Sequence, residues 1–356
     1  MNNKINDANT AVKTKKVSQF KEVWKRFKKN PLAMVGMFII MLMVLMAIFA
    51  DVLAPPDAIG MPGYNLQNWT NARQFPSAEH IFGTDSLGRD IFARIAHGAR
   101  YSLAVGFVVV GIGLTAGVTL GAIAGFFAGV TDNIIMRILD IVLAMPTILL
   151  AIAIVAMLGP GLYSVMIAVG IAVIPGYARL VKAQVLTVKN QEFVEAARSC
   201  GAGNIRLIFR HILPNCLAPI IVEATMGLAG GILSAAGLSF LGIGLQPPIP
   251  EWGAMLSDGR GWILAGYWHM TVFPGLFIAL LIFSLNMMGD GLRDAFDPRL
   301  RGASFSKRKF KKLQAERFAA DAKLQAAAST ATANTTIVAN ANDSGELPDS
   351  FEGGEQ

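Results

Sequence analysis

The segment FVEAARSCGAGNIRLIFRHILPN, residues 193–215, decides the fold that we predict for this chain. It is basic, it is too polar to cross a lipid bilayer, and it lies between two long apolar stretches. Its pattern predicts two short helices, 191–199 and 205–212, with a sharp turn at Gly201 and Gly203. We therefore expect the loop 190–214 to protrude from the membrane as a helix-turn-helix lever.

Individual residues of this lever have expected roles. Ala196 and Ala197 have small side chains, so that a partner can approach the lever closely, and Glu195 supplies a single charge. Gly201 is expected to adopt backbone angles that other residues avoid, and Pro214 is expected to end the second helix. One apolar face of that helix is predicted from its spacing: Ile205, Ile208, Phe209 and Ile212. The alternative is an ordinary loop that carries one amphipathic helix.

The composition predicts an all-α, polytopic membrane protein. Of 356 residues, 53% are hydrophobic and only 15% are charged, whereas a soluble domain carries roughly 25% charged residues. Lipid leaves no place for an open sheet edge, so the long apolar runs are expected to be helices. Six transmembrane helices are predicted, at 32–53, 101–128, 134–158, 162–180, 217–245 and 271–288.

Basic residues predict the orientation of these helices. Residues 1–31 hold nine Lys or Arg, and further basic residues lie in 179–214 and after the sixth apolar stretch. The positive-inside rule places these regions and both termini in the cytoplasm. Outer loops are expected at 54–100 and 246–270. Because the positive charge follows the membrane topology, the net charge of +7 does not indicate nucleic-acid binding.

The two ends differ from the membrane domain, which we place at 32–302. Within the cytoplasmic N-terminus, 1–31, the spacing of Phe20, Val23, Trp24 and Phe27 predicts an amphipathic helix at the inner membrane surface. A short solvated helix is the alternative. The tail, 303–356, is Ala/Thr/Asn-rich and then Gly/Glu/Asp-rich, so we expect it to be disordered and cytoplasmic.

Small residues in the second apolar stretch predict close helix packing. Glycines that recur every four residues leave a groove without side chains on one helix face, where a neighbouring helix can approach closely. They are Gly113, Gly117, Gly121, Gly125 and Gly129. The signal indicates packing and not chemistry.

Prolines and charges also lie inside the predicted spans. Pro146, Pro175 and Pro274 are expected to kink their helices, either as static bends or as hinges. Arg137 precedes Asp140 by three positions, which predicts an ion pair and not a proton relay. Glu223 has no obvious local partner and is expected either to line a pathway or to bond to a neighbouring subunit.

The motifs of an enzyme are not found in this sequence. No nucleophile–base pair and no cluster of metal ligands is recognisable. Cys200 and Cys216 are expected to be free thiols. An intramembrane enzyme would have only Asp140 and Glu223 as internal acids, and a channel or ion-driven carrier would leave the lever without a role.

The lever resembles the EAA loop by which the membrane subunit of an ABC importer binds its ATPase. The matching positions are Glu195-Ala196-Ala197, then Gly201, then Leu213-Pro214. His211 departs from the apolar residue of the general motif, although RHILPN is similar to the variant in peptide permeases. The resemblance assigns ATPase coupling to Glu195, Ala196, Ala197, Gly201, Leu213 and Pro214.

Four other segments resemble the dipeptide, oligopeptide and nickel permeases. They are HIFGTDSLGRDIFARIAHGARYSL (80–103), PGYARLVKAQVL (175–186), EWGAMLSDGR (251–260) and GDGLRDAFDPRLRG (289–302). The resemblance covers roughly residues 20–302. The GTD-x-LGRD segment in the long first loop is similar to that of the second, C-type, permease subunit.

This resemblance implies a type I ABC importer permease in a prokaryotic cell membrane. The implied partners are a homologous second permease, one or two ATPase subunits, an extracytoplasmic solute-binding protein and a peptide substrate. The sequence has no G-x-x-x-x-G-K-[ST] loop, so the partners are expected to bind ATP, and no cofactor is expected in this chain. Nickel or another small solute is the alternative substrate, although His80 and His97 are expected to be ordinary polar residues.

Overall fold

The computed structural model describes residues 19–56, 61–297 and 314, and none of these forms a β-strand. The chain divides into two units, Met1–Phe296 and Asp297–Gln356, and the described residues lie almost entirely in the first. The tail 303–356, for which disorder was predicted, lies outside the described residues apart from Gln314.

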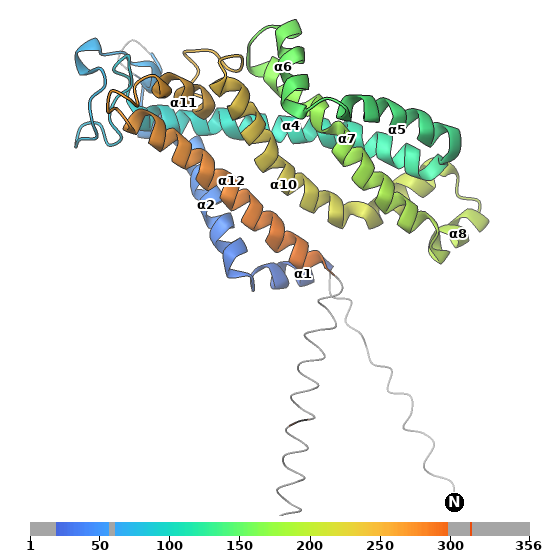
Figure 1. Ribbon diagram of the computed structural model, residues 1–356. Coiled ribbons are helices and arrows are strands. Elements are labelled where there is room, and N and C mark those ends of the chain that lie inside the picture. The colour runs from blue at the N-terminus through green and yellow to red at the C-terminus, as the bar shows by residue number, and fades with distance from the viewer. Residues whose placement is uncertain (1–18, 57–60, 298–313, 315–356) are drawn as a thin grey trace, which may run out of the picture. The chain divides into compact units, whose positions relative to one another are not determined.

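Five helical segments are long and apolar enough to cross a membrane (Figure 1). Helices α5 and α6 together supply a sixth span if the bent pair is counted as one. The all-helical membrane architecture predicted from composition is therefore confirmed. The five segments are α2 (Pro31–Ile48), α4 (Ile91–Phe127), α7 (Leu162–Lys189), Asn204–Phe240 and α12 (His269–Phe296).

The predicted third span is not one straight helix. It consists of α5 (Gly129–Leu143) and α6 (Thr147–Leu158), whose axes differ by 86°. Pro146 precedes α6 with extended backbone angles, φ −53° and ψ 132°, and so interrupts the hydrogen-bond ladder. The other two internal prolines, Pro175 and Pro274, lie within the continuous helices α7 and α12.

Helix α4 begins at Ile91, ten residues before the predicted start of the second span. Asp90 caps it, because its side chain accepts a hydrogen bond of 2.8 Å from the Ala93 N–H. The added turns contain Arg94 and His97, which hydropathy places outside a membrane span. Both side chains are buried, so tertiary contacts and not lipid stabilise this first part of α4.

Glycines of α4 lie against α7. A Cβ at Gly113 would be 2.8 Å from the Tyr177 ring, and one at Gly117 would be 2.5 Å from the Tyr177 Cβ. At Gly121 the added atom would meet the Ala178 carbonyl, and at Gly125 it would lie 3.0 Å from the Lys182 carbonyl oxygen. Gly129 lies beyond this row, at the start of α5, with no atom within 4 Å.

Helix α1 (Gln19–Phe27) packs against the chain with part of its apolar face. Phe27 is 2% exposed and packs with Ala33 and Ala295, whereas Trp24 is 41% exposed and stacks on Phe27. The Phe20 side chain lies outside the described part. Placement of α1 at a membrane surface stays a prediction.

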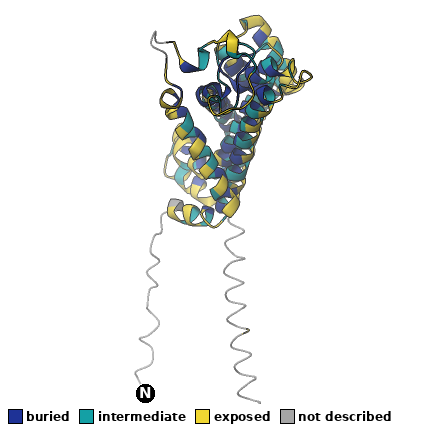
Figure 2. Cartoon of the chain, turned by 90° about the vertical axis from the view of Figure 1, so that its left-hand side faces the viewer, coloured by how far each residue is buried: buried dark blue, intermediate teal, exposed yellow. Residues whose placement is uncertain are grey.

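A cap of short elements covers the N-terminal end of α4. We call residues 61–90, the first turns of α4 and helix α11 (Trp252–Arg260) the polar cap. Buried residues gather in the interior where the long helices meet the cap (Figure 2). The short elements of this part are α3 (Ala50–Leu53), η1 (Gly63–Asn65) and η2 (Trp69–Asn71).

Candidate functional site: the hairpin between α7 and α10

The hairpin consists of α8 (Glu192–Ser199), α9 (Asn204–Arg206) and η3 (Leu207–Ile212), and it joins α7 to α10 (Leu213–Phe240). Gln191 lies before α8 with extended backbone, φ −84° and ψ 147°. Glu192 and Glu195 occupy the first turn, where negative charge complements the helix dipole.

Gly201 forms the turn of the hairpin. Its φ is +86°, a region that side chains rarely adopt, and its N–H donates to the Arg198 carbonyl at 2.9 Å. The next N–H, of Ala202, donates to the Ala197 carbonyl at 3.1 Å. No atom lies within 4 Å of an added Cβ, so the backbone angle and not crowding requires glycine here.

Pro214 does not end the second helix, contrary to the prediction. Helical backbone runs without a break from Asn204 to Phe240, and the segment before Pro214, η3, is π-helical. The Leu213 N–H bonds to the Ile208 carbonyl, one residue further back than in an α-helix. Pro214 then falls in the first turn of α10, where its missing donor is tolerated.

The inner face of the hairpin packs on α7 and α10. Val194 of α8 is 1% exposed, and Leu207 and Ile212 are fully buried. They share a core with Val181 and Val185 of α7 and with Cys216 of α10. This apolar core holds the hairpin rigidly relative to both membrane helices.

The predicted apolar face of the second helix is divided in the structure. Ile208 and Ile212 are buried, but Ile205 is 76% exposed and Phe209 is 66% exposed. The wider π-helical turn changes the angular position of residues after Arg206, so a period of 3.6 misplaces them. Phe193, which the sequence interpretation did not single out, is 39% exposed and adds a third apolar side chain to the surface.

The residues matched to the EAA loop fall into two groups. Glu195, Ala196, Gly201 and Pro214 are exposed, whereas Ala197 and Leu213 are half-buried against the hairpin core. None of the charged side chains in 192–212 forms an ion pair or side-chain hydrogen bond with any residue that the structure describes. They are Glu192, Glu195, Arg198, Arg206 and Arg210. The exposed surface of the hairpin thus combines bulky apolar groups with unpaired charges of both signs.

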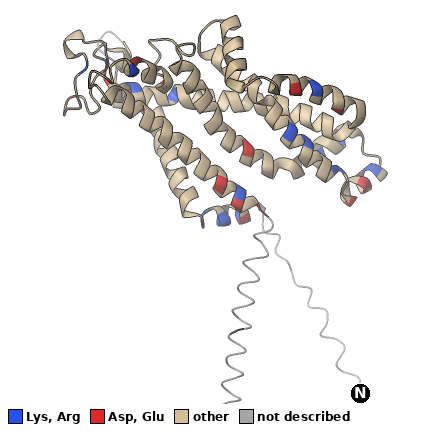
Figure 3. Cartoon of the chain, in the orientation of Figure 1, with Lys and Arg blue, Asp and Glu red and all other residues tan. Residues whose placement is uncertain are grey.

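Charged residues of α5 pair with α7 (Figure 3). The ion pair predicted for Asp140 exists, but its partner is Arg179 at 2.5 Å and not Arg137. A second pair joins Lys182 and Asp132 at 2.6 Å. Both partners come from far along the chain, so a local spacing rule could not find them.

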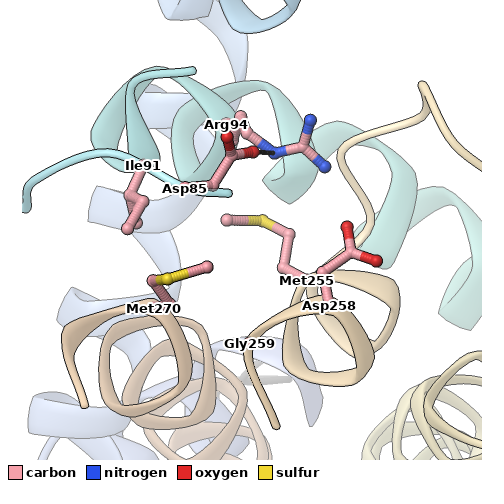
Figure 4. A pocket seen from close by; sticks show the side chains of 7 residues that line it. All are labelled: Asp85, Ile91, Arg94, Met255, Asp258, Gly259 and Met270. Carbon is pink, nitrogen blue, oxygen red and sulfur yellow. Dashed lines mark ion pairs between the residues drawn. The ribbon is translucent and has the colours of Figure 1, made fainter. Parts of the chain in front are cut away.

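The polar cap contains the most buried charges of the described residues (Figure 4). Asp85 accepts hydrogen bonds from the Arg89 N–H at 3.0 Å and from the Arg89 Nε at 2.6 Å. Arg94 lies with its Nε 3.6 Å from Asp85, across a small cavity from Asp258 and Met255. Burial raises the pKa of Asp258, although both arginines act against that shift.

Glu251 closes the cap at the start of α11. Its carboxylate accepts a hydrogen bond of 2.9 Å from the Ala254 N–H. Burial raises its pKa, and bonds from the Gly253 and Ala254 N–H groups partly offset the shift.

His80, before α4, and His97, in the first turns of α4, both contact carboxylates. His80 lies 2.7 Å from Asp90, and His97 lies 3.1 Å from Asp51. Among the residues that the structure describes, no group of three His, Cys, Asp or Glu is placed to hold a metal ion.

Two family models match the chain. Residues 117–302 match the binding-protein-dependent transport system inner membrane component. Residues 18–76 match the N-terminal transmembrane domain of oligopeptide transport permease C. Together the matches include α1, α2 and every element from the last third of α4 to α12.

Curated relatives match over most of their length. The dipeptide transport system permease protein DppC of Alkalihalophilus pseudofirmus is 52% identical over 285 residues, 80% of this chain and 91% of that protein. The di/tripeptide transport system permease protein DppC of Pseudomonas aeruginosa is 45% identical over 81% of this chain and 94% of its own length. The glutathione transport system permease protein GsiD of Escherichia coli is 46% identical over 79% and 91%. A solved structure of the MetNI methionine ABC transporter aligns with 57% of this chain and 97% of its own, at 20% identity and a TM-score of 0.48.

Proposed function

Because the chain belongs to the family of binding-protein-dependent transport system inner membrane components, we propose that it is the C-type permease subunit of an ATP-driven importer of di- or oligopeptides. The relatives are named for dipeptides, di/tripeptides and glutathione, which favours a peptide over nickel as the transported solute. The chain is a multi-pass membrane protein, and the proposed orientation places both termini in the cytoplasm, as the positive-inside rule predicts.

The exposed surface of the hairpin is the feature that supports its proposed role in coupling the ATPase to transport. Phe193, Ile205 and Phe209 are exposed on an element that is held rigidly by its inner face. Large apolar side chains beside unpaired charges are typical of a surface that binds another protein. A groove on a cytoplasmic ATPase subunit is the proposed occupant.

The proposed roles of the motif residues follow from their positions. Glu195 and Ala196 are exposed and would contact the ATPase, with Glu195 as a charged anchor and Ala196 allowing close approach. Gly201 sets the angle between α8 and α9 through its positive φ. Ala197, Leu213 and Pro214 would fix the hairpin to α10. In this account α7 and α10 carry motion of the ATPase into the membrane.

Transport requires partners that complete the path and supply energy. We propose a homologous second permease, one or two ATPase subunits that bind ATP, and an extracytoplasmic solute-binding protein that delivers the peptide. This chain is proposed to have no ATPase site of its own, because the phosphate-binding loop motif does not occur in its sequence.

Reconstituted vesicles test this function. The complete complex should accumulate a labelled dipeptide only when ATP and the solute-binding protein are both supplied. The purified chain alone should neither bind nor hydrolyse ATP. ATPase activity in a preparation shown to be free of other subunits would refute the proposal that only the partner subunits hydrolyse ATP. Uptake of nickel without uptake of peptide would replace the proposed solute.

A further inference from the structure

Glu223 is the one charged residue of α10, and it lies in the interior of this membrane helix (Figure 3). It is half-buried, and it forms neither an ion pair nor a hydrogen bond with any described residue. A carboxylate at this depth costs several kcal/mol when it faces lipid, on the order of 2.5–3.5 kcal/mol in insertion experiments. Glu223 must therefore face either water in a path or a polar group of another molecule.

The Tyr177 hydroxyl lies beside the same face of α10. Its ring occupies the groove that Gly113 and Gly117 leave on α4, and its exposed fraction is 4%. The hydroxyl oxygen occupies the space where a side chain at Gly227 would begin, 1.9 Å from the position of an added Cβ, and Gly227 follows Glu223 by one helical turn. The hydroxyl has no hydrogen-bond partner in the described structure.

An unpartnered buried hydroxyl is unfavourable, by about 1–3 kcal/mol. The glycine groove fixes the Tyr177 ring, so the hydroxyl cannot turn away to find water elsewhere. A ligand that donates hydrogen bonds to both the carboxylate of Glu223 and this hydroxyl would satisfy both groups. Such a ligand is a cation with several N–H donors on a small centre.

Small residues continue the same face of α10 beyond Glu223. Gly227 and Ser234 are half-buried, and Gly230 is exposed with no atom within 4 Å of an added Cβ. At 3.6 residues per turn these positions continue the line of Glu223 towards the cap end of the helix. The carboxylate thus lies on a smooth strip without bulky side chains.

We propose that the Glu223 carboxylate and the Tyr177 hydroxyl form a subsite that binds a primary ammonium group of the solute as it crosses the membrane. This inference rests on the proposed function and deepens it, because it names the chemical group that this permease recognises. A peptide carries that group at its N-terminus or on a lysine side chain. Charge-assisted hydrogen bonds to the ammonium would offset its loss of hydration in the path.

A thiol reporter at Gly230 tests the subsite in the assembled complex. Cys200 and Cys216 are first replaced by alanine, and Gly230→Cys is then introduced with either Glu223 or Glu223→Gln. Its rates of reaction with cationic aminoethyl and anionic sulfonatoethyl methanethiosulfonate are compared. Leu264→Cys, in a fully exposed loop, is the matched control reporter.

The expected result is a preference for the cationic reagent at residue 230 that falls by about threefold or more in Glu223→Gln, because a local negative charge concentrates cations. Glu223→Asp should retain the preference, and the reporter at Leu264 should respond to neither change. No reaction at residue 230 in the assembled complex would overturn the proposal, since another subunit would then cover this face. An unchanged reagent preference in Glu223→Gln would also overturn it.

Peptide protection identifies the ligand group. Alanyl-alanine should slow the labelling at residue 230, and N-acetyl-alanyl-alanine at the same concentration should not. Glu223→Gln should abolish the protection, and Tyr177→Phe should weaken it while leaving the reagent preference intact. N-acetyl-lysyl-alanine distinguishes an N-terminal ammonium from a lysine side-chain ammonium. It slows the labelling at residue 230 only if the subsite binds a side-chain ammonium. Equal protection by the free and acetylated dialanine peptides would sink the proposal.

The proposed function is tested separately by ATP-driven dipeptide uptake through the wild-type complex. Uptake together with an insensitive reporter would reject the subsite alone. A complex that accumulates no peptide would reject the function.

Discussion

Asp85 and Arg89 of the polar cap are almost completely buried and lie 2.6 Å apart, whereas Glu195 and Arg198 of the hairpin are exposed and pair with none of the described residues. Two aromatic residues next to these charges show a similar contrast, although Trp69 at the edge of the cap is 68% exposed. Trp252 of the cap is fully buried and donates to the Ile95 carbonyl at 3.1 Å, but Phe209 of the hairpin is 66% exposed. The buried carboxylate and guanidinium groups of the cap pair with one another around Trp252, whereas the charges of the hairpin pair with no described residue.

This difference shows that one chain can contain a region whose buried charges pair with each other and another region whose charges stay exposed and unpaired. Both regions contain the same residue types, so composition does not distinguish them. The distinction lies in whether partners come from the same chain. Helices α4 and α7 connect the two regions, and their glycine-mediated contact is the part through which a disturbance in one would reach the other.

Removing a buried charge from the cap is expected to have the largest effect. Asp85→Asn should destabilise the protein by about 3–5 kcal/mol, because Arg89 and Arg94 would lose their buried counter-ion. Thermal unfolding of the purified permease and its amount in membranes measure this loss. Asp290→Asn, an exposed change on α12, is the control. Equal unfolding temperatures for wild type and Asp85→Asn would show that the cap is not held together by its own ion pairs.

Filling the groove between α4 and α7 is expected to cause the second-largest loss of stability. Gly121→Val should cost about 1–3 kcal/mol, because the new side chain meets the Ala178 carbonyl and α7 must shift. Gly111→Val lies on the same helix with no atom within 4 Å and should be nearly neutral. Unfolding temperatures of the two variants, measured side by side, decide the matter. Similar values would mean that close contact along this row does not support the link between the two regions.

A bulky residue at the hairpin turn should reduce transport with little loss of protein. Gly201→Val forces a β-branched residue to φ +86°, which strains the backbone by about 1–2 kcal/mol or misaims α9. We expect about tenfold slower peptide uptake per permease molecule. Gly203→Val is the matched control, because Gly203 has φ −70° and open space around it. If both variants transport alike, the turn angle has no role in coupling.

The long apolar runs allowed the helical membrane fold to be predicted, because length and hydropathy are properties of one segment. The start of α4 was missed, since burial of Arg94 and His97 depends on residues of the cap that lie many positions away in the sequence. The break at Pro146 could not be told from the uninterrupted helices at Pro175 and Pro274. A proline ring removes one donor in each case, and only neighbouring helices decide whether the backbone recovers.

The candidate site was predicted in outline and not in detail. The positive φ of Gly201 follows from a local rule, and the structure has it. The exposed position of Phe209 follows from a π-helical segment, Leu207–Ile212, that no spacing rule anticipates. Asp140 shows the same limit, because its partner Arg179 belongs to a different helix.

Cross-linking from Phe209 tests the central claim most directly. In a chain without other cysteines, Phe209→Cys is treated with a reagent that joins a thiol to a nearby lysine, in membranes that contain the whole complex. Tyr163→Cys is the control, because Tyr163 is 77% exposed and lies at the end of α7 away from the hairpin. The account predicts a product between Phe209→Cys and the ATPase subunit that Tyr163→Cys does not form. An ATPase product from Tyr163→Cys, with none from Phe209→Cys, would contradict the assignment of the hairpin as the ATPase-binding surface.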